Sequence, residues 1–253
     1  MTASAVRDAR VLTRRSLRHV LRSPDTIVTT AVTPVAMLLL FVHVLGGAID
    51  AGQADYVDYL LPGVLVVTVA SGIAYTAFRL HVDVATGVVE RFASLPVSRA
   101  AVLWGHVLTS LVANAASLVL VVLVALAIGF RSGAGVLAWL AVAGLLLLLT
   151  LALTWLAVLP GLTAGSPDGV SGFSYPLVFL PFLSSAFVPT STMSGPVRWF
   201  AEHQPVTPLV DAVRALLAGE PAGADALTAV VWLTALLVVA YALAVRTYRR
   251  RVG

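Results

Sequence analysis

The chain lacks two residue types altogether and is poor in charge. Its 253 residues include no cysteine, which excludes disulfide bonds and cysteine-ligated metal sites. All 16 basic residues are arginine, because lysine is absent. The Walker A loop that cradles ATP phosphates needs a lysine, so we expect the chain to bind no ATP in that way. Charged residues make up only 11% of the sequence, whereas soluble proteins carry about 25%.

Apolar residues fill the chain instead. The sequence is 59% hydrophobic, with a mean hydropathy of +0.97. Its uncharged windows are long enough to cross a bilayer, which takes about 20 apolar residues as a helix. Continuous apolar runs favour helices over a barrel, whose strands alternate. We therefore predict an all-α membrane protein in which residues 1–253 form a single transmembrane domain with six transmembrane helices, near 26–48, 59–78, 100–129, 136–158, 169–188 and 226–245.

Arginine is distributed unevenly between the loops. Thirteen arginines lie in segments on one side of the predicted bundle: before the first span, in the loop 79–99 and after the last span. The opposite side holds only Arg131, Arg198 and Arg214, together with most of the acidic residues. Because cytoplasmic loops carry an excess of Lys and Arg, both termini are expected in the cytoplasm. The N-terminus has no apolar core of the kind a signal peptide requires. We expect a multi-pass protein of the bacterial inner (plasma) membrane.

Residues 5–22 have the pattern of an amphipathic helix that lies on the membrane surface. Five arginines, from Arg7 to Arg22, recur at spacings of three and four residues, and apolar residues fall largely on the opposite side. Such a helix would place its arginines against anionic lipid. The alternative is a disordered tail whose charge only sets the topology.

The polar loop 79–99 separates the second and third predicted spans. Asp83 to Ala93 can form a short helix, and Leu95-Pro96 would end it, because proline disfavours a helix just before itself. A short charged helix held by two spans could transmit a push from a soluble motor protein into the bundle. An ordinary cytoplasmic loop is an equally good explanation of this pattern.

Two motifs resemble those of a known family. Gly87 to Gly105 contains G-x-x-x-R-F-x-S-L-P-V-S-R-x-x-V-L-x-G, which is similar to the signature loop of ABC type-2 exporter permeases. Phe182 to Met193 (FLSSAFVPTSTM) and Ala201 to Leu216 (AEHQPVTPLVDAVRAL) give a second match in the right order. The daunorubicin-resistance branch is the most similar. His106, Ser194 and Gln204 stand where that family often has arginine, proline and asparagine.

The resemblance implies a permease subunit of an ABC exporter that moves an amphipathic drug-like, lipid or natural-product substrate out of the cell. Separate ABC ATPase subunits would use ATP and Mg²⁺, and two permeases would form a homodimer or a close heterodimer within the lipid bilayer. We expect this chain to have no catalytic residue, metal, cofactor or nucleic-acid partner. The loop would couple the ATPase to the bundle through Asp83, Gly87, Glu90, Arg91, Leu95, Pro96 and Arg99.

The fifth predicted helix and the segment after it contain further candidates. Prolines and aromatic residues interrupt this helix, and such helices usually face protein or a cavity. A substrate path or a dimer seam is possible there, with simple kinked packing as the alternative; the candidate residues are Phe179, Phe182, Ser184 and Ser185. Residues 189–224 contain two short helical runs, around 195–203 and 207–218, which resemble re-entrant outer helices.

Several polar residues have a structural explanation at least as good as a functional one. Asn114 in the third predicted span is a candidate for hydrogen bonds between helices. Glu202, His203, Asp211 and Arg214 lack a nucleophile or metal-ligand spacing beside them, so we expect them to pair structurally.

Two other function classes fit the sequence less well. An ATP-independent secondary transporter would normally carry acidic or lysine residues within its spans to couple ions, and the predicted spans contain none. An intramembrane enzyme would show a nucleophile with its base or an acidic metal cluster within the spans, and neither pattern is present. Transport driven by a proton gradient alone would favour the secondary transporter over the ABC permease.

Overall fold

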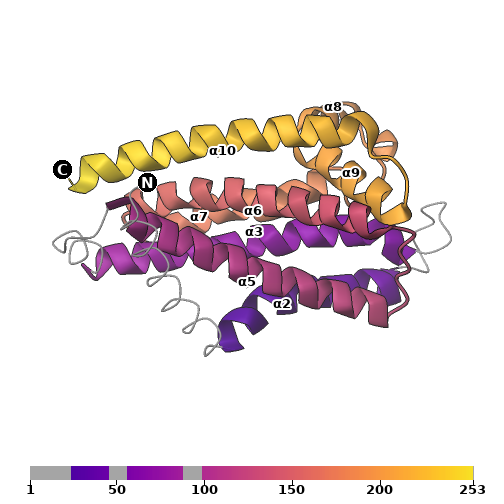
Figure 1. Ribbon diagram of the computed structural model, residues 1–253, viewed down its shortest axis with the longest axis horizontal. Coiled ribbons are helices and arrows are strands. Elements are labelled where there is room, and N and C mark those ends of the chain that lie inside the picture. Colours follow the sequence, from indigo (N-terminus) through magenta and orange to yellow (C-terminus); the bar gives the residue numbers. More distant parts are fainter. Residues whose placement is uncertain (1–23, 46–55, 88–98, 253) are drawn as a thin grey trace.

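The computed structural model describes residues 24–45, 56–87 and 99–252. Every regular element within these ranges is helical, and the elements run roughly along one long axis (Figure 1). In chain order the elements are α2 (Pro24–Leu39), the π-helix η1 (Leu40–Leu45), α3 (Tyr56–Ala85), α5 (Arg99–Ala127), α6 (Val136–Thr163), α7 (Pro167–Phe179), the 3-10 helices η2 (Leu180–Leu183) and η3 (Thr190–Thr192), α8 (Gly195–His203), α9 (Val206–Ala218) and α10 (Gly223–Val252). The predicted N-terminal helix at 5–22 lies outside the described residues.

Four helices, α3, α5, α6 and α10, are long and apolar enough to span a membrane. Each has 28 to 30 residues, which exceeds the roughly 20 that cross the hydrocarbon layer. These helices extend the predicted spans at 59–78, 136–158 and 226–245 at one or both ends, because a helix can continue past the apolar layer into water. The all-α prediction is confirmed for the described residues.

Helix α3 lies at the centre of the bundle. In its most apolar stretch 78% of the residues are buried, against 22% to 39% in the other three long helices. α2, α5, α6, α7 and α9 all pack against α3. A helix that is apolar on all sides is stable only when protein or lipid surrounds it, and here protein surrounds α3.

The first and fifth predicted spans are not α-helical throughout their described residues. α2 ends at Leu39 and continues as the π-helix to Leu45. α7 ends at Phe179 and is followed by the 3-10 helix η2, so a continuous helix over 169–188 was wrong in its second half. Pro181 lies in η2 and cannot donate a backbone hydrogen bond, and the chain becomes extended at Ser184.

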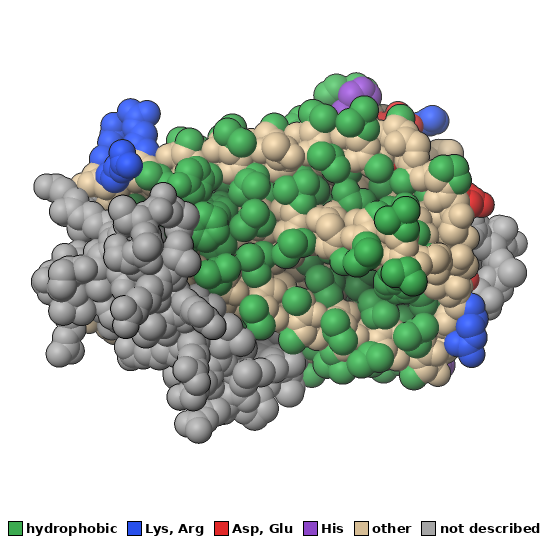
Figure 2. Space-filling model, viewed as in Figure 1, with side chains coloured by type: hydrophobic (Ala, Val, Ile, Leu, Met, Phe, Trp, Pro, Cys, Tyr) green, Lys and Arg blue, Asp and Glu red, His purple; other side chains and the backbone are tan. Residues whose placement is uncertain are grey.

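The two short helices predicted after the fifth span are confirmed as α8 and α9. α9 is buried on most of its surface and packs on α3, α6 and α10. It ends at Gly219, whose φ of +83° is a left-handed conformation that favours glycine. We call this end of the bundle the α9 end. The other end, where α3 ends, α5 begins and α10 carries Arg246, Arg249 and Arg250, is the arginine-rich end (Figures 1 and 2).

Candidate functional site

The predicted coupling residues begin at the last turn of α3. This helix continues to Ala85, so Asp83 belongs to it and does not start a separate helix, contrary to the prediction. Gly87 then takes a φ of +73°, and its N–H donates to the Val84 carbonyl at 3.2 Å. A left-handed glycine here ends the helix. Arg99 is the first residue of α5, and Glu90, Arg91, Leu95 and Pro96 lie outside the described residues.

One polar contact joins the two helices that flank this segment. His106 Nε2 of α5 lies 3.3 Å from Asp83 Oδ2 of α3, and both side chains are partly exposed. In the sequence, His106 is only a departure from the family pattern, and its contact with Asp83 was not predicted. The signal that could have pointed to it was its position, one residue after the signature run that ends at Gly105. The pair holds the start of α5 against the end of α3.

Apolar packing supports the arginine-rich end beneath that pair. Leu80 and Val84 of α3 share a buried cluster with Leu103 and Val107 of α5. The same cluster extends to Trp155 of α6 and to Tyr248 of α10. A displacement of the α3–α5 connection would therefore reach α6 and α10 through side-chain contacts.

At the α9 end, Arg214 and Asp211 pair with each other, as expected from the sequence. The Arg214 guanidinium also donates to the Ser185 carbonyl at 2.8 Å and lies 4.0 Å from the centre of the Tyr59 ring. Ser185 Oγ donates to Asp211 Oδ1 at 2.7 Å, and Tyr59 Oη donates to the Ser185 carbonyl at 3.0 Å. This network joins α3, α9 and the segment after η2.

The other two charged candidates of this region also have structural partners. Glu202 pairs with Arg198 one helical turn earlier, at 2.7 Å. His203 stacks on Trp199, and its Nδ1 lies 2.7 Å from the Trp199 carbonyl. Among the described residues, no group of three or more His, Asp or Glu side chains could hold a metal ion.

The four residues predicted to line a substrate path or dimer seam fall into two kinds. Ser184 and Ser185 are buried, and the Ser184 hydroxyl donates to the Pro181 carbonyl at 2.6 Å. Phe179 and Phe182 are 60% and 38% exposed. Phe182 stacks on Phe187 with ring centres 4.7 Å apart. The exposed aromatic rings are thus available to a partner or ligand, whereas the two serine hydroxyls are already hydrogen bonded within the chain. The assignment as path or seam stays a prediction.

A row of hydroxyl groups crosses the middle of the bundle. Thr76 of α3 donates to Ser110 Oγ of α5 at 2.9 Å, and Ser110 Oγ lies 3.2 Å from Thr154 Oγ1 of α6. Asn114 Nδ2 donates to the Ser110 carbonyl within its own helix, at 2.9 Å. Among the described residues, Ser110, rather than Asn114 as predicted, therefore makes the side-chain hydrogen bonds that join α3, α5 and α6 here. Asn114 packs against Gly72, where a Cβ would come within 2.2 Å of its Oδ1.

Comparison with known proteins identifies the family of this chain. The sequence profile of the ABC-2 type transporter family matches residues 7–218. The chain is 31% identical over 233 residues to the daunorubicin resistance ABC transporter permease protein of Streptomyces coeruleorubidus, covering 90% of this chain and 81% of that protein. It is 23% identical over 239 residues to a Mycobacterium tuberculosis protein named "Probable doxorubicin resistance ABC transporter permease protein", covering 94% and 87%. The chain belongs to the ABC-2 type transporter family, as the signature motifs predicted.

Proposed function

We propose that this chain is the membrane permease of an ABC exporter and that a separate ATPase subunit drives it. The family match over residues 7–218 carries the proposal, because that range includes the whole predicted coupling segment. The substrate is an amphipathic drug-like molecule, lipid or natural product, a class that includes the drugs in the relatives' names. The chain itself binds no nucleotide.

The proposed topology places the arginine-rich end in the cytoplasm. Arg246, Arg249 and Arg250 lie at that end, and the positive-inside rule favours it as the cytoplasmic side. α2 with η1 and α7 with η2 complete six spans beside the four long helices. α9 re-enters the membrane from outside, which fits its burial within the bundle. Two such chains, identical or closely related, form the pathway.

In this proposal the ATPase acts on the segment after Asp83. Its closure pushes the end of α3 and the start of α5, and the Asp83–His106 pair makes these two ends move together. The shared apolar cluster passes the displacement to α6 and α10. The permease then opens to the outside and releases the substrate.

The test uses the permease and its ATPase reconstituted together in vesicles. Asp83→Asn should reduce doxorubicin-stimulated ATP hydrolysis several-fold while the protein still inserts and folds. Glu90→Ala and Arg91→Ala, in the predicted docking segment, should act in the same direction. Asp225→Asn makes the same chemical change at an exposed residue of the α9 end and should leave the stimulation unchanged.

Two results would count against the proposal. ATP hydrolysis that does not change when the permease is present would remove the coupling role. Doxorubicin transport by the purified permease alone, driven by a proton gradient, would favour a secondary transporter instead.

A further inference from the structure

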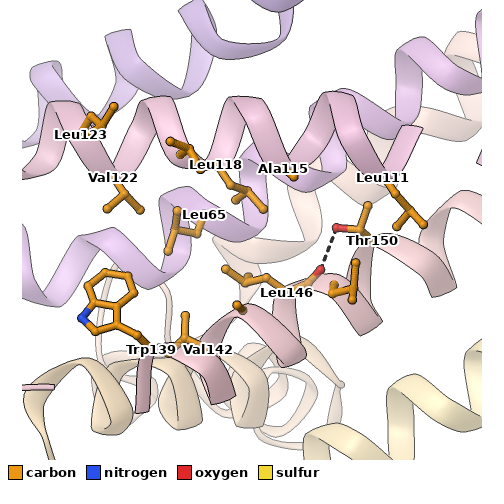
Figure 3. A pocket seen from close by; sticks show the side chains of 13 residues that line it. Leu65, Leu111, Ala115, Leu118, Val122, Leu123, Trp139, Val142, Leu146 and Thr150 are labelled. Carbon is orange, nitrogen blue, oxygen red and sulfur yellow. Dashed lines mark hydrogen bonds between the residues drawn. The ribbon is translucent and has the colours of Figure 1, made fainter. Parts of the chain in front are cut away.

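An apolar groove runs between α5 and α6, with Leu65 of α3 in its floor (Figure 3). Its volume is about 400 Å³, within the range of roughly 300–1,000 Å³ typical of ligand sites. The side chains that line it are almost all aliphatic: Leu65, Leu111, Ala115, Leu118, Val119, Val122, Leu123, Trp139, Val142, Ala143, Leu146, Leu147 and Thr150. The groove is distinct from the coupling segment and from the aromatic residues around Phe182.

The groove carries no charge and offers little hydrogen bonding. The hydroxyl of Thr150 already donates to the Leu146 carbonyl at 2.7 Å (Figure 3). A ligand with several polar groups would leave them without partners here, which costs free energy. A hydrocarbon chain gives up no hydrogen bond when it moves from the lipid into the groove, because it makes only dispersion contacts in both environments.

The position and length of the groove also fit a hydrocarbon chain. Leu65 and Leu146 in the floor are buried, whereas Val119, Leu123 and Leu147 on the rim are 53% to 59% exposed. Both walls belong to helices long enough to span the membrane, and apolar side chains cover much of the face seen in Figure 2. We therefore expect the open side to face lipid. From Leu111 to Leu123 the helix rises about 18 Å, somewhat more than half of a hydrocarbon layer of about 30 Å.

A cation lies beyond the end of the groove that contains Leu123 and Trp139. Arg131 follows α5 and is exposed; its Nη1 donates to the Phe130 carbonyl at 3.0 Å and to the Leu126 carbonyl at 3.4 Å. These contacts fold the guanidinium back over the last turn of α5. Its Nε and Nη2 have no acceptor among the described residues, and none of the described carboxylates pairs with it. Tryptophan is typical of the layer where lipid headgroups begin.

We infer that the α5–α6 groove is a binding site for one membrane phospholipid. One acyl chain lies in the groove, and Arg131 donates to the headgroup phosphate. This resident lipid fills the space between two spans and is not the exported substrate. The inference goes beyond the proposed export function, because it needs only that α5 and α6 face lipid.

Native mass spectrometry of the full chain tests the site, with phosphatidylglycerol titrated onto delipidated protein in detergent. The wild type should retain one phospholipid after the others have dissociated. Ala143→Phe, which fills the groove from its exposed rim on α6, should abolish this retention. Ala115→Phe should do the same from the α5 wall. Ala141→Phe places the same ring on an exposed part of α6 outside the groove and should retain the lipid.

The headgroup contact is tested by Arg131→Gln. It should weaken retention of phosphatidylglycerol about tenfold, the effect of one charge-assisted hydrogen bond. A long-chain alcohol, which has the chain but no phosphate, should bind equally to the wild type and to Arg131→Gln. Equal lipid retention by the wild type, Ala143→Phe and Ala115→Phe would overturn the site. An unchanged affinity in Arg131→Gln would overturn the phosphate contact. The assay contains neither ATP nor ATPase, so its failure would leave the export proposal untouched.

Discussion

The two ends of the bundle are joined by different contacts. At the α9 end, Arg214 and Asp211 join three segments through several hydrogen bonds. At the arginine-rich end, the polar contact between α3 and α5 is the Asp83–His106 pair. Charge-assisted bonds to partly buried groups are among the stronger ones in proteins. The Asp83–His106 pair is a single polar contact, and the buried apolar cluster that contains Leu80 and Leu103 packs beside it. The comparison indicates an α9 end joined by directional polar bonds and an arginine-rich end held mainly by apolar packing, which is non-directional.

This difference fits the proposed mechanism, in which the ATPase pushes on the arginine-rich end of the bundle. An end that receives a push must move relative to its neighbours without losing the fold. A rigid opposite end keeps α9 and the segment after η2 in place while the rest of the bundle moves. The following substitutions test that contrast, in order of decreasing effect on stability.

The largest effect is expected at the contact between Gly219 and Gly133. Gly219 has a φ of +83°, and a Cβ there would lie 2.7 Å from the Gly133 carbonyl oxygen. Gly219→Ala combines backbone strain with a backbone clash and should lower the free energy of unfolding by about 3 kcal/mol. The measurement is equilibrium unfolding in mixed detergent micelles containing sodium dodecyl sulfate.

Gly223 is the matched control for that substitution. It also has a positive φ, +53°, but no atom would lie within 4 Å of its Cβ. Gly223→Ala should therefore lower the free energy of unfolding only through backbone strain, by about 1 kcal/mol. If both variants lost the same stability, the close approach of the α5–α6 connection to α9 would not be a rigid contact.

An intermediate effect is expected for Arg214→Ala. The substitution leaves Asp211 and the carbonyl of Ser185 without their charged donor, which should lower the unfolding free energy by about 2 kcal/mol. Arg198→Ala removes the exposed pair with Glu202 on α8 and should cost less than about 0.5 kcal/mol. Similar losses in the two variants would show that the network does not hold the α9 end.

The smallest effect is expected for Asp83→Asn. Because Asp83 and His106 are both partly exposed, loss of this single polar contact should change the unfolding free energy by less than about 0.5 kcal/mol. The same variant should nevertheless reduce stimulated ATP hydrolysis in the coupling assay. A stability loss as large as that of Arg214→Ala would remove the contrast between the two ends.

Much of the helix pattern could be predicted from sequence because local signals were strong. Pro205 separates α8 from α9 and Pro208 lies in the first turn of α9, and the predicted runs at 195–203 and 207–218 agree closely with these helices. The second half of the fifth span was mispredicted because apolarity alone does not separate an α-helix from the 3-10 helix around Pro181. The start of a separate helix at Asp83 was mispredicted because α3 continues to Ala85, and the rest of that prediction, from residue 88 on, lies outside the described residues.

The sequence by itself determined the features that depend on local composition. Long uncharged runs specify membrane-spanning helices, the uneven arginines distinguish the two ends, and the signature motifs identify the family. The tertiary structure alone decided which distant groups meet. Arg214 donates to the carbonyl of Tyr59, 155 residues away, because α9 packs onto the start of α3. The α5–α6 groove likewise depends on how two smooth aliphatic helices pack, which helical periodicity in one chain segment does not specify.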